Sequence, residues 1–276
     1  MKIPEDEPDH SPEIIGLLPA GGQATRLAPL PCSKELYPVG FRLVGEDDFR
    51  PKVVCHYLLE KMQQAGASKA YIILREGKWD IPAYLGDGAL VGLPLAYLMM
   101  NLPYGTPFTL DQAYPFVRRA NIVFGFPDIL FQPNDAFPRL FKHQAETKAD
   151  VVLGLFPADK PHKMDMVEFD EHQRVRRVVI KPKQTSLTYT WIIAVWTPVF
   201  TTFMHQFLAQ KLGDDTIRTK EIFMGDIFQA AIDNGLDVES LRFAEGRCID
   251  IGTPEDLVIA THQFAETVVR SAVRNI

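Results

Sequence analysis

The chain is 276 residues long, 46% hydrophobic and 23% charged, which is the balance of an ordinary globular protein. Its formal net charge of −6 argues against a protein that follows nucleic-acid phosphates, because such proteins carry a basic excess on one face. A small phosphorylated substrate is compatible with this charge, since a few cations in one cleft are enough to bind it. The cysteines are widely spaced and include no C-x-x-C pair, which indicates free thiols in a reducing compartment.

Residues 1–12 are acidic and proline-rich, and they predict a flexible N-terminal extension without the apolar core of a secretory signal. The longest apolar stretch, residues 89–102, contains Pro94 and is too short to span a bilayer. Nothing between residues 13 and 276 has the composition of a linker or of an internal repeat. We therefore expect one folded domain over residues 13–276, in the cytoplasm and without membrane or nucleic-acid partners.

The first predicted elements form a strand–loop–helix–strand unit. Residues 14–19 are a short apolar run typical of a buried strand, and a loop of small residues follows directly. Residues 53–65 carry apolar side chains at helical spacing, with Gly66 in the place of a C-terminal cap. Residues 70–74 are a second apolar strand. Parallel sheets covered by helices are built from units of this kind.

The same alternation continues along the chain. Further strands are expected at residues 121–126, 150–156 and 191–196, with a hairpin at 166–181 around a polar turn at 170–173. Helices are expected at residues 198–212 and 220–234, then one or two short strands within 238–248, and a last helix from Pro254. We therefore expect an α/β fold. It has a Rossmann-like, mixed and mainly parallel sheet flanked by helices, with an inserted antiparallel hairpin region.

The loop after the first strand has the composition of a phosphate-binding segment. Small residues there let backbone N–H groups approach phosphate oxygens, while Arg26 offers a planar fork and Lys34 a point charge. The loop lacks the Gly-Lys-Ser/Thr end of a P-loop and the G-x-G-x-x-G spacing of dinucleotide-binding folds. The alternative is a tight turn with solvated basic residues. The expected nucleotide-binding positions are Ala20, Gly21, Gly22, Gln23, Ala24 and Thr25.

This segment resembles the signature loop of the sugar-1-phosphate nucleotidyltransferases, the family of glucose-1-phosphate thymidylyl- and uridylyltransferases. Their pattern is G-G-x-G-T-R-L-x-P, followed by a lysine before a hydrophobic-Pro-hydrophobic turn. The likeness runs from Ile14 to about Phe264. Further segments that match motifs of the family are Leu85-Gly86-Asp87-Gly88, Pro103-Tyr104-Gly105, Asp128, Lys181-Pro182 and Asp250-Ile251-Gly252-Thr253-Pro254-Glu255.

The resemblance implies an enzyme that condenses a nucleoside triphosphate with a sugar 1-phosphate and releases pyrophosphate. It makes Asp128 and Asp250 the ligands of Mg²⁺, an ion that prefers oxygen ligands and commonly takes one or two carboxylates plus substrate phosphates. Each aspartate follows a predicted strand, so the two carboxylates are expected to meet at the edge of the sheet. A phosphate monoester is already an ionised nucleophile, so neither a general base nor a covalent intermediate is required.

The resemblance also assigns roles to the other matching residues. Arg26 is expected to hold the triphosphate, Lys34 the α-phosphate, and Lys181 the phosphate of the incoming sugar phosphate. Both reactants are anions, so catalysis here is largely a matter of charge neutralisation and alignment. The remaining positions expected to border the nucleotide are Gly86, Asp87, Gly88 and Gly105. A homo-oligomer is compatible with the resemblance.

Four departures from the family pattern leave alternatives open. Ala24 replaces the second loop glycine, and Pro127 replaces the glycine before the metal-binding aspartate. Ile180 takes the place of a glutamate that hydrogen-bonds sugar hydroxyls in relatives, and Phe108 falls where thymidylyltransferases have a polar residue near the base. One alternative is a nucleotidyltransferase for another phosphate, such as phosphocholine. The other is a catalytically inactive relative that binds sugar nucleotides.

Overall fold

The computed structural model describes residues 12–44, 48–100, 102, 104–213 and 221–273. The predicted flexible extension therefore lies almost wholly outside the described residues, as do Pro103 and Lys220, where a family motif and a helix were expected to begin. Among the described helices, none is long and apolar enough to cross a bilayer.

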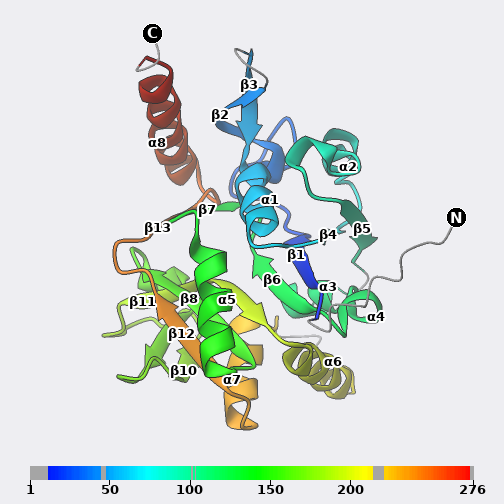
Figure 1. The fold of residues 1–276 in the computed structure, drawn as a ribbon, viewed down its shortest axis with the longest axis vertical. Coiled ribbons are helices and arrows are strands. Elements are labelled where there is room, and N and C mark those ends of the chain that lie inside the picture. The colour runs from blue at the N-terminus through cyan, green and yellow to red at the C-terminus, as the bar shows by residue number, and fades with distance from the viewer. Residues whose placement is uncertain (1–11, 45–47, 101, 103, 214–220, 274–276) are drawn as a thin grey trace, which may run out of the picture.

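A nine-stranded mixed sheet forms the middle of the molecule (Figure 1). Strand β1 lies between β4 and β6, and these strands together with β5 are parallel. Strand β11 runs antiparallel to β6, β8 and β9, while β12 is parallel to β8. The strands are β1 (Ile14–Ala20), β4 (Lys69–Leu74), β5 (Leu95–Met99), β6 (Asn121–Gly125), β8 (Val151–Pro157), β9 (Met166–Phe169), β10 (Val175–Val179), β11 (Tyr189–Trp196) and β12 (Val238–Arg242).

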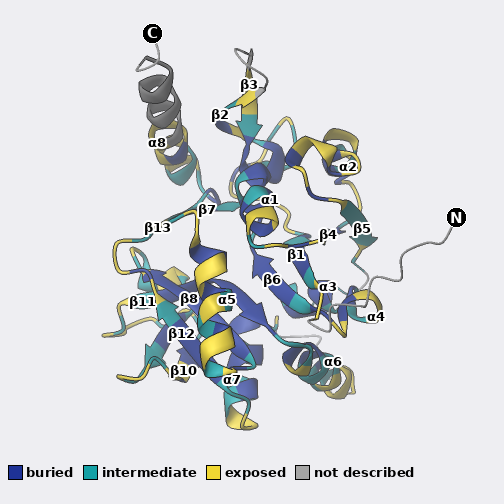
Figure 2. Cartoon of the chain, viewed as in Figure 1, coloured by how far each residue is buried: buried dark blue, intermediate teal, exposed yellow. Residues whose placement is uncertain are grey.

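Helices cover both faces of this sheet, which explains why its central strands are continuous apolar runs rather than alternating ones. Side chains of α1 (Val54–Gln64), α2 (Asp80–Leu85) and α5 (Ala136–Thr147) join one buried core. Side chains of α3 (Thr106–Asp111), α4 (Tyr114–Val117), α6 (Pro198–Leu212) and α7 (Met224–Asp233) join the other. Figure 2 shows the central strands β1, β6 and β8 mostly buried and the outward side of α5 exposed. The expected fold class is confirmed, with the hairpin β9–β10 on one edge of the sheet.

Element boundaries agree with the expected ones where the local signal is strong. Helix α6 covers the predicted residues 198–212, and α1 ends before Gly66, whose φ of +85° suits glycine. Helix α7 begins at Met224, later than predicted, because the Asp226 carboxylate accepts the backbone N–H of Phe223 at 2.8 Å and caps the helix there.

Two small sheets outside the central one were not predicted. One is the hairpin of β2 (Pro38–Val44) and β3 (Asp48–Val53), against which helix α8 (Pro254–Val273) packs. Figure 1 shows the hairpin and α8 at the same end of the molecule. The other is an antiparallel pair of β7 (Ile129–Gln132) and β13 (Arg247–Asp250). This second pair determines the geometry of the site described below.

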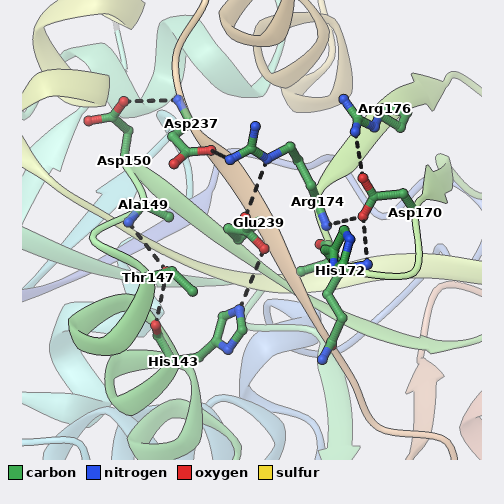
Figure 3. A network of polar contacts seen from close by, with 12 residues as sticks. His143, Thr147, Ala149, Asp150, Asp170, His172, Arg174, Arg176, Asp237 and Glu239 are labelled. Atoms are coloured by element: carbon green, nitrogen blue, oxygen red, sulfur yellow. Dashed lines mark hydrogen bonds and ion pairs between the residues drawn. The ribbon is translucent and has the colours of Figure 1, made fainter.

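A network of polar contacts fastens the β9–β10 hairpin to the sheet (Figure 3). The Arg174 guanidinium lies 3.6 Å from Asp237 and 3.7 Å from Glu239, and Glu239 is 3.7 Å from His143 on α5. The carboxylate of Asp170 closes the hairpin turn by accepting the backbone N–H of Arg174 at 3.0 Å. These contacts fix the turn end of the hairpin against β12 and α5.

Candidate active site

The loop after β1 lies at the carboxyl ends of the parallel strands, where α/β folds bind ligands. Gly21, Gly22 and Gln23 line a cavity of about 510 Å³, called here the loop-side cavity. A Cβ on Gly21 would lie 2.8 Å from the Met100 sulfur, so the backbone approaches its neighbour closely there. The Gln23 side-chain oxygen, in the amide orientation that satisfies both groups, accepts a hydrogen bond from Arg75 at 2.6 Å.

The remaining predicted loop positions lie outside this cavity. Ala20 is the last residue of β1 and is buried in the core. Ala24 and Thr25 form the turn in which the backbone N–H of Leu27 donates to the Ala24 carbonyl at 3.0 Å. Ala24 has φ of +52°, so the chain places alanine in a left-handed conformation that glycine would adopt without strain.

Lys34 is the charged centre of the loop-side cavity. Its ammonium forms a part-buried ion pair with the carboxylate of Asp128. Burial by itself lowers the pKa of Lys34, but the carboxylates of Asp128 and Asp250 outweigh burial, so the pKa is raised and the lysine stays charged. The turn that carries it is anchored by Asp80, which accepts the backbone N–H of Ser33 at 2.6 Å and its hydroxyl at 2.7 Å.

Asp128 and Asp250, far apart in the sequence, lie side by side. Strands β7 and β13 pair with Asp250 opposite Ile129, and the Ile251 N–H donates to the Asp128 carbonyl at 3.2 Å. Burial first, and the charge of Asp128 second, raise the pKa of Asp250, while Lys34 and Arg26 oppose that rise. The two carboxylates therefore do meet, although a separate two-stranded sheet, and not the edge of the central sheet, brings them together.

This pair of carboxylates fits a magnesium ion. One oxygen of Asp250, Oδ1, is buried and has no hydrogen-bond partner in the described part of the chain, an arrangement that is costly unless another group compensates it. Within the described residues, no group of three or more histidine, cysteine, aspartate or glutamate side chains is arranged to hold a metal. Two carboxylates with substrate phosphates and water is the ligand set that Mg²⁺ commonly takes.

Arg26 lies next to Gly252 and Asp250. Its guanidinium is 2.7 Å from the point where a Cβ on Gly252 would stand, so the absence of a side chain at Gly252 makes room for it. Arg26 lines a large groove of about 880 Å³ together with Asp128, Asp250 and Lys181. The groove therefore combines two cationic side chains with the two aspartates.

Lys181 also lines a third cavity of about 270 Å³, called here the hairpin-side cavity. Its ammonium lies over the ring of Phe223, 3.7 Å from the ring centroid. Phe126 borders all three cavities, Asp128 borders the loop-side cavity and the groove, and Asp250 borders the groove and the hairpin-side cavity. The three cavities are thus parts of one continuous site with the aspartates at its centre.

A family model described as nucleotidyl transferase matches residues 15–267, which is most of the chain. The chain belongs to this family.

Curated relatives agree with this assignment. The chain is 24% identical over 255 residues to the low-salt glycan biosynthesis nucleotidyltransferase of Haloferax volcanii, covering 91% of this chain and 66% of that protein. It is 26% identical over 245 residues to a glucose-1-phosphate thymidylyltransferase of Streptomyces antibioticus, covering 88% of this chain and 64% of that protein. This chain therefore spans slightly less than two thirds of the length of these relatives.

Solved structures share the fold. A Bacillus anthracis protein described as a glucose-1-phosphate thymidylyltransferase, in complex with sucrose, superposes with a TM-score of 0.76 at 20% identity, over 91% of this chain and 94% of that one. A UDP-glucose pyrophosphorylase complexed with UDP-glucose superposes with a TM-score of 0.72 at 15% identity, over 91% and 98%. At these identities the likeness establishes the fold of this nucleotidyl transferase family member and nothing finer.

Of the two segments expected to border the nucleotide, one lines a cavity of the site and the other does not. Gly105 lines the loop-side cavity with φ of +117°, and a Cβ there would lie 2.0 Å from the Ile222 carbonyl oxygen, so only glycine fits. Residues 86–88 line none of the three cavities. The Gly86 carbonyl accepts the Tyr97 hydroxyl at 2.7 Å, and Asp87 accepts the Ala89 N–H at 3.0 Å. A nucleotide contact by Gly86, Asp87 or Gly88 stays a prediction.

One expectation about the base is wrong. Phe108 is 2% exposed and packs edge-on against Tyr104, within the core and away from the cavities. Its neighbour Thr109 lines the loop-side cavity instead, because the helical turn of α3 directs successive side chains about 100° apart. A polar side chain therefore lines this cavity one position later, and its contact with a base stays a prediction.

Two residues of the site were missed by the sequence reasoning. Arg75 lines the loop-side cavity directly after β4, and its place at the carboxyl end of a parallel strand was a usable signal. Asp165 lines the hairpin-side cavity next to Lys181. No local pattern marks it, because it precedes a short strand in an otherwise ordinary hairpin.

Proposed function

We propose that this chain is a sugar-1-phosphate nucleotidyltransferase, which joins a nucleoside monophosphate to a sugar 1-phosphate and releases pyrophosphate. The observation that carries the proposal is the meeting of Asp128 and Asp250 around Lys34, next to a glycine-lined cavity. Family membership supports the same chemistry.

In this proposal the loop-side cavity takes the nucleoside triphosphate. Backbone N–H groups of Gly21 and Gly22 approach the phosphates, while Arg75 adds a guanidinium beside them. Gly105 and Thr109 border the base. Lys34 holds the α-phosphate, exchanging its ion pair with Asp128 for the incoming anion.

The groove and the hairpin-side cavity take the acceptor. Lys181 holds the acceptor phosphate and directs one of its oxygens at the α-phosphorus. Arg26 lines the groove together with Asp128, which also borders the loop-side cavity, and from there it neutralises the charge of the departing pyrophosphate. Asp128 and Asp250 would hold Mg²⁺, which neutralises phosphate charge when bound. The acceptor phosphate is ionised at neutral pH, so the chain needs no general base.

Release of pyrophosphate tests the proposal. We would incubate the protein with Mg²⁺, each nucleoside triphosphate in turn and a panel of phosphorylated acceptors, and we expect release only when triphosphate and acceptor are both present. Asp128→Asn removes a carboxylate while nearly preserving its shape, and we expect a rate at least about 1,000-fold lower. The matched control is Asp135→Asn, which makes the same change on an exposed residue that lines none of the three cavities.

The outcomes separate the competing functions. Undiminished turnover by Asp128→Asn would refute the proposed metal site. Release with phosphocholine but with no sugar phosphate would favour the second candidate, which is supported by the apolar side chain of Ile180 beside the acceptor cavity. Nucleotide-sugar binding without any release would favour a catalytically inactive relative.

A further inference from the structure

The hairpin-side cavity combines aromatic walls with a carboxylate that the proposed chemistry does not use. Phe126, Trp191 and Phe223 line it, and the rings of Phe126 and Trp191 are 5.6 Å apart. Asp165 contributes the carboxylate, from the residue immediately before β9. Lys181 shares the cavity and is already assigned to the acceptor phosphate.

The Asp165 carboxylate is held in place but incompletely satisfied. The Thr190 hydroxyl donates to the Asp165 backbone carbonyl at 2.9 Å, which fixes the start of the strand. The side-chain oxygen Oδ1 is buried and has no partner in hydrogen-bonding geometry among the described residues. The indole Nε1 of Trp191 and the backbone N–H of Lys181 both lie close enough to the carboxylate to help lower the pKa of Asp165, and the indole nitrogen also has no partner in hydrogen-bonding geometry among the described residues. The protein thus places donors beside this carboxylate and leaves it an acceptor oxygen that a polar ligand in the cavity can use.

Asp165 lies next to Ile180 in space. A Cβ placed on Gly225 would lie 2.3 Å from the Ile180 Cδ1 and 2.8 Å from the Asp165 Oδ2, so these two atoms are close to the same point. Both side chains therefore converge on the start of α7. The Ile180 side chain has no polar atom, so of this neighbouring pair only Asp165, which lines the cavity, offers a polar side chain to the acceptor.

The carboxylates of the cavity can accept a cation. With Asp250 assigned to Mg²⁺, Asp165 and Glu221 remain for the acceptor, and Lys163 and Lys181 line the cavity with them. Burial raises the pKa of Asp165 to about 6, the Lys181 ammonium opposes this, and the nearby Asp226 carboxylate adds to it. When Lys181 binds an acceptor phosphate, that anion takes up part of the positive charge that Lys181 supplies to Asp165. A positive charge on the ligand would replace it.

The aromatic walls suit the same ligand. A cation is attracted to the face of an aromatic ring within about 6 Å of its centroid. The Lys181 ammonium already occupies such a position over Phe223, at 3.7 Å. Phe126 and Trp191 offer two further rings on the wall of the cavity.

We infer that Asp165 binds a positively charged amine on the acceptor, so that the preferred acceptor is an amino compound carrying a phosphate monoester. This inference rests on the nucleotidyl transfer of the proposed function and specifies the acceptor, and it holds whether that acceptor is a sugar phosphate or, as in the second candidate function, the phosphate of an amino alcohol. Two sources have this chemistry: an unacetylated amino-sugar phosphate and the phosphate of an amino alcohol. In both, the phosphate contacts Lys181 and the amine contacts Asp165 and the surrounding rings.

Two matched pairs of acceptors test the inference by pyrophosphate release. Glucosamine 1-phosphate is compared with glucose 1-phosphate, and phosphocholine with its neutral isostere 3,3-dimethylbutyl phosphate. We expect the charged member of at least one pair to have a kcat/KM at least about tenfold higher than its neutral counterpart. The pair that shows the difference identifies the source of the amine.

The variant Asp165→Asn keeps the shape of the side chain and removes its charge. We expect its KM for the charged acceptor to rise about tenfold with kcat little changed, while the neutral acceptor is unaffected. The control is Glu168→Gln, which removes a carboxylate three residues further along the chain, on β9. The Glu168 carboxylate pairs with Arg177 at 3.0 Å, and Glu168 lines none of the three cavities. It should leave both acceptors unchanged.

The possible failures are distinguishable. Equal turnover of charged and neutral acceptors by the wild-type protein overturns the inference and leaves the proposed function standing. So does an Asp165→Asn variant that retains the full preference. No pyrophosphate with any acceptor overturns the proposed function, and the inference with it. If Asp165→Asn does not fold, the wild-type preference between matched acceptors decides the question.

Discussion

The left-handed backbone of Ala24 has an energetic consequence that follows directly from its geometry. At φ of +52° the alanine Cβ is crowded by the neighbouring carbonyl, which costs about 1–2 kcal/mol. Glycine at this position removes the strain. It also gives the unfolded chain more conformational freedom, which offsets about 0.4–1 kcal/mol of that gain. We therefore expect Ala24→Gly to raise the free energy of unfolding by about 0.5–1 kcal/mol.

Two glycines provide matched controls for the backbone argument. Gly235 has φ of +81°, and no heavy atom lies within 4 Å of the point where a Cβ on it would stand. Gly235→Ala therefore tests conformation alone and should lower stability by about 0.5–1 kcal/mol. Gly213 has φ of −77°, a right-handed conformation, so Gly213→Ala should raise stability by about 0.4–1 kcal/mol.

Urea unfolding followed by far-ultraviolet circular dichroism measures all three variants. The midpoints should shift with unchanged slopes, because the surface exposed on unfolding is the same. In thermal melts, a change of about 1 kcal/mol corresponds to about 2–4 °C for a chain near this size. A loss of stability in Ala24→Gly, or no loss in Gly235→Ala, would contradict the assignment of strain to Ala24.

Two buried charged or titratable groups give further predictions. His56 is fully buried, and neither ring nitrogen has a hydrogen-bond partner among the residues that the structure describes. Burial, together with the charges of Arg42 and Lys52, lowers its pKa to about 4. Since its unfolded pKa is about 6.5, its neutral form stabilises the fold above that pH, and the contribution is lost as pH falls toward 4. The free energy of unfolding of His56→Leu, measured with urea, should therefore increasingly exceed that of the wild type as the pH is lowered from 7 to 5. A difference that does not change with pH would contradict this. Lys78 forms a buried ion pair with Glu35 at 2.6 Å, so Lys78→Met should cost about 3–5 kcal/mol by leaving the carboxylate unpaired. The double variant with Glu35→Gln should recover part of that loss in the same assay, and no recovery would argue against the pairing.

Much of the fold could be predicted because its signals are local. Apolar runs and helical spacing identified the strands β1, β4, β6, β8 and β11 and the helices α1 and α6 close to their ends. The hairpin β2–β3 was missed because Pro38, Gly40 and Pro51 break the alternation that identifies a strand. The start of α7 depended on a capping contact between Asp226 and Phe223, which spacing alone does not reveal.

For the site, too, some features follow from the sequence and others only from the tertiary structure. The sequence by itself determined the glycine-rich loop, its basic residues and the two aspartates, because these are matters of residue type and order. Only the tertiary structure decided that Asp128 and Asp250 lie together, since the β7–β13 ladder that joins them is a pairing of distant segments. It also decided that Thr109 and not Phe108 faces the cavity, and that Asp165 lies beside Ile180, because packing and helical direction set which side chains meet.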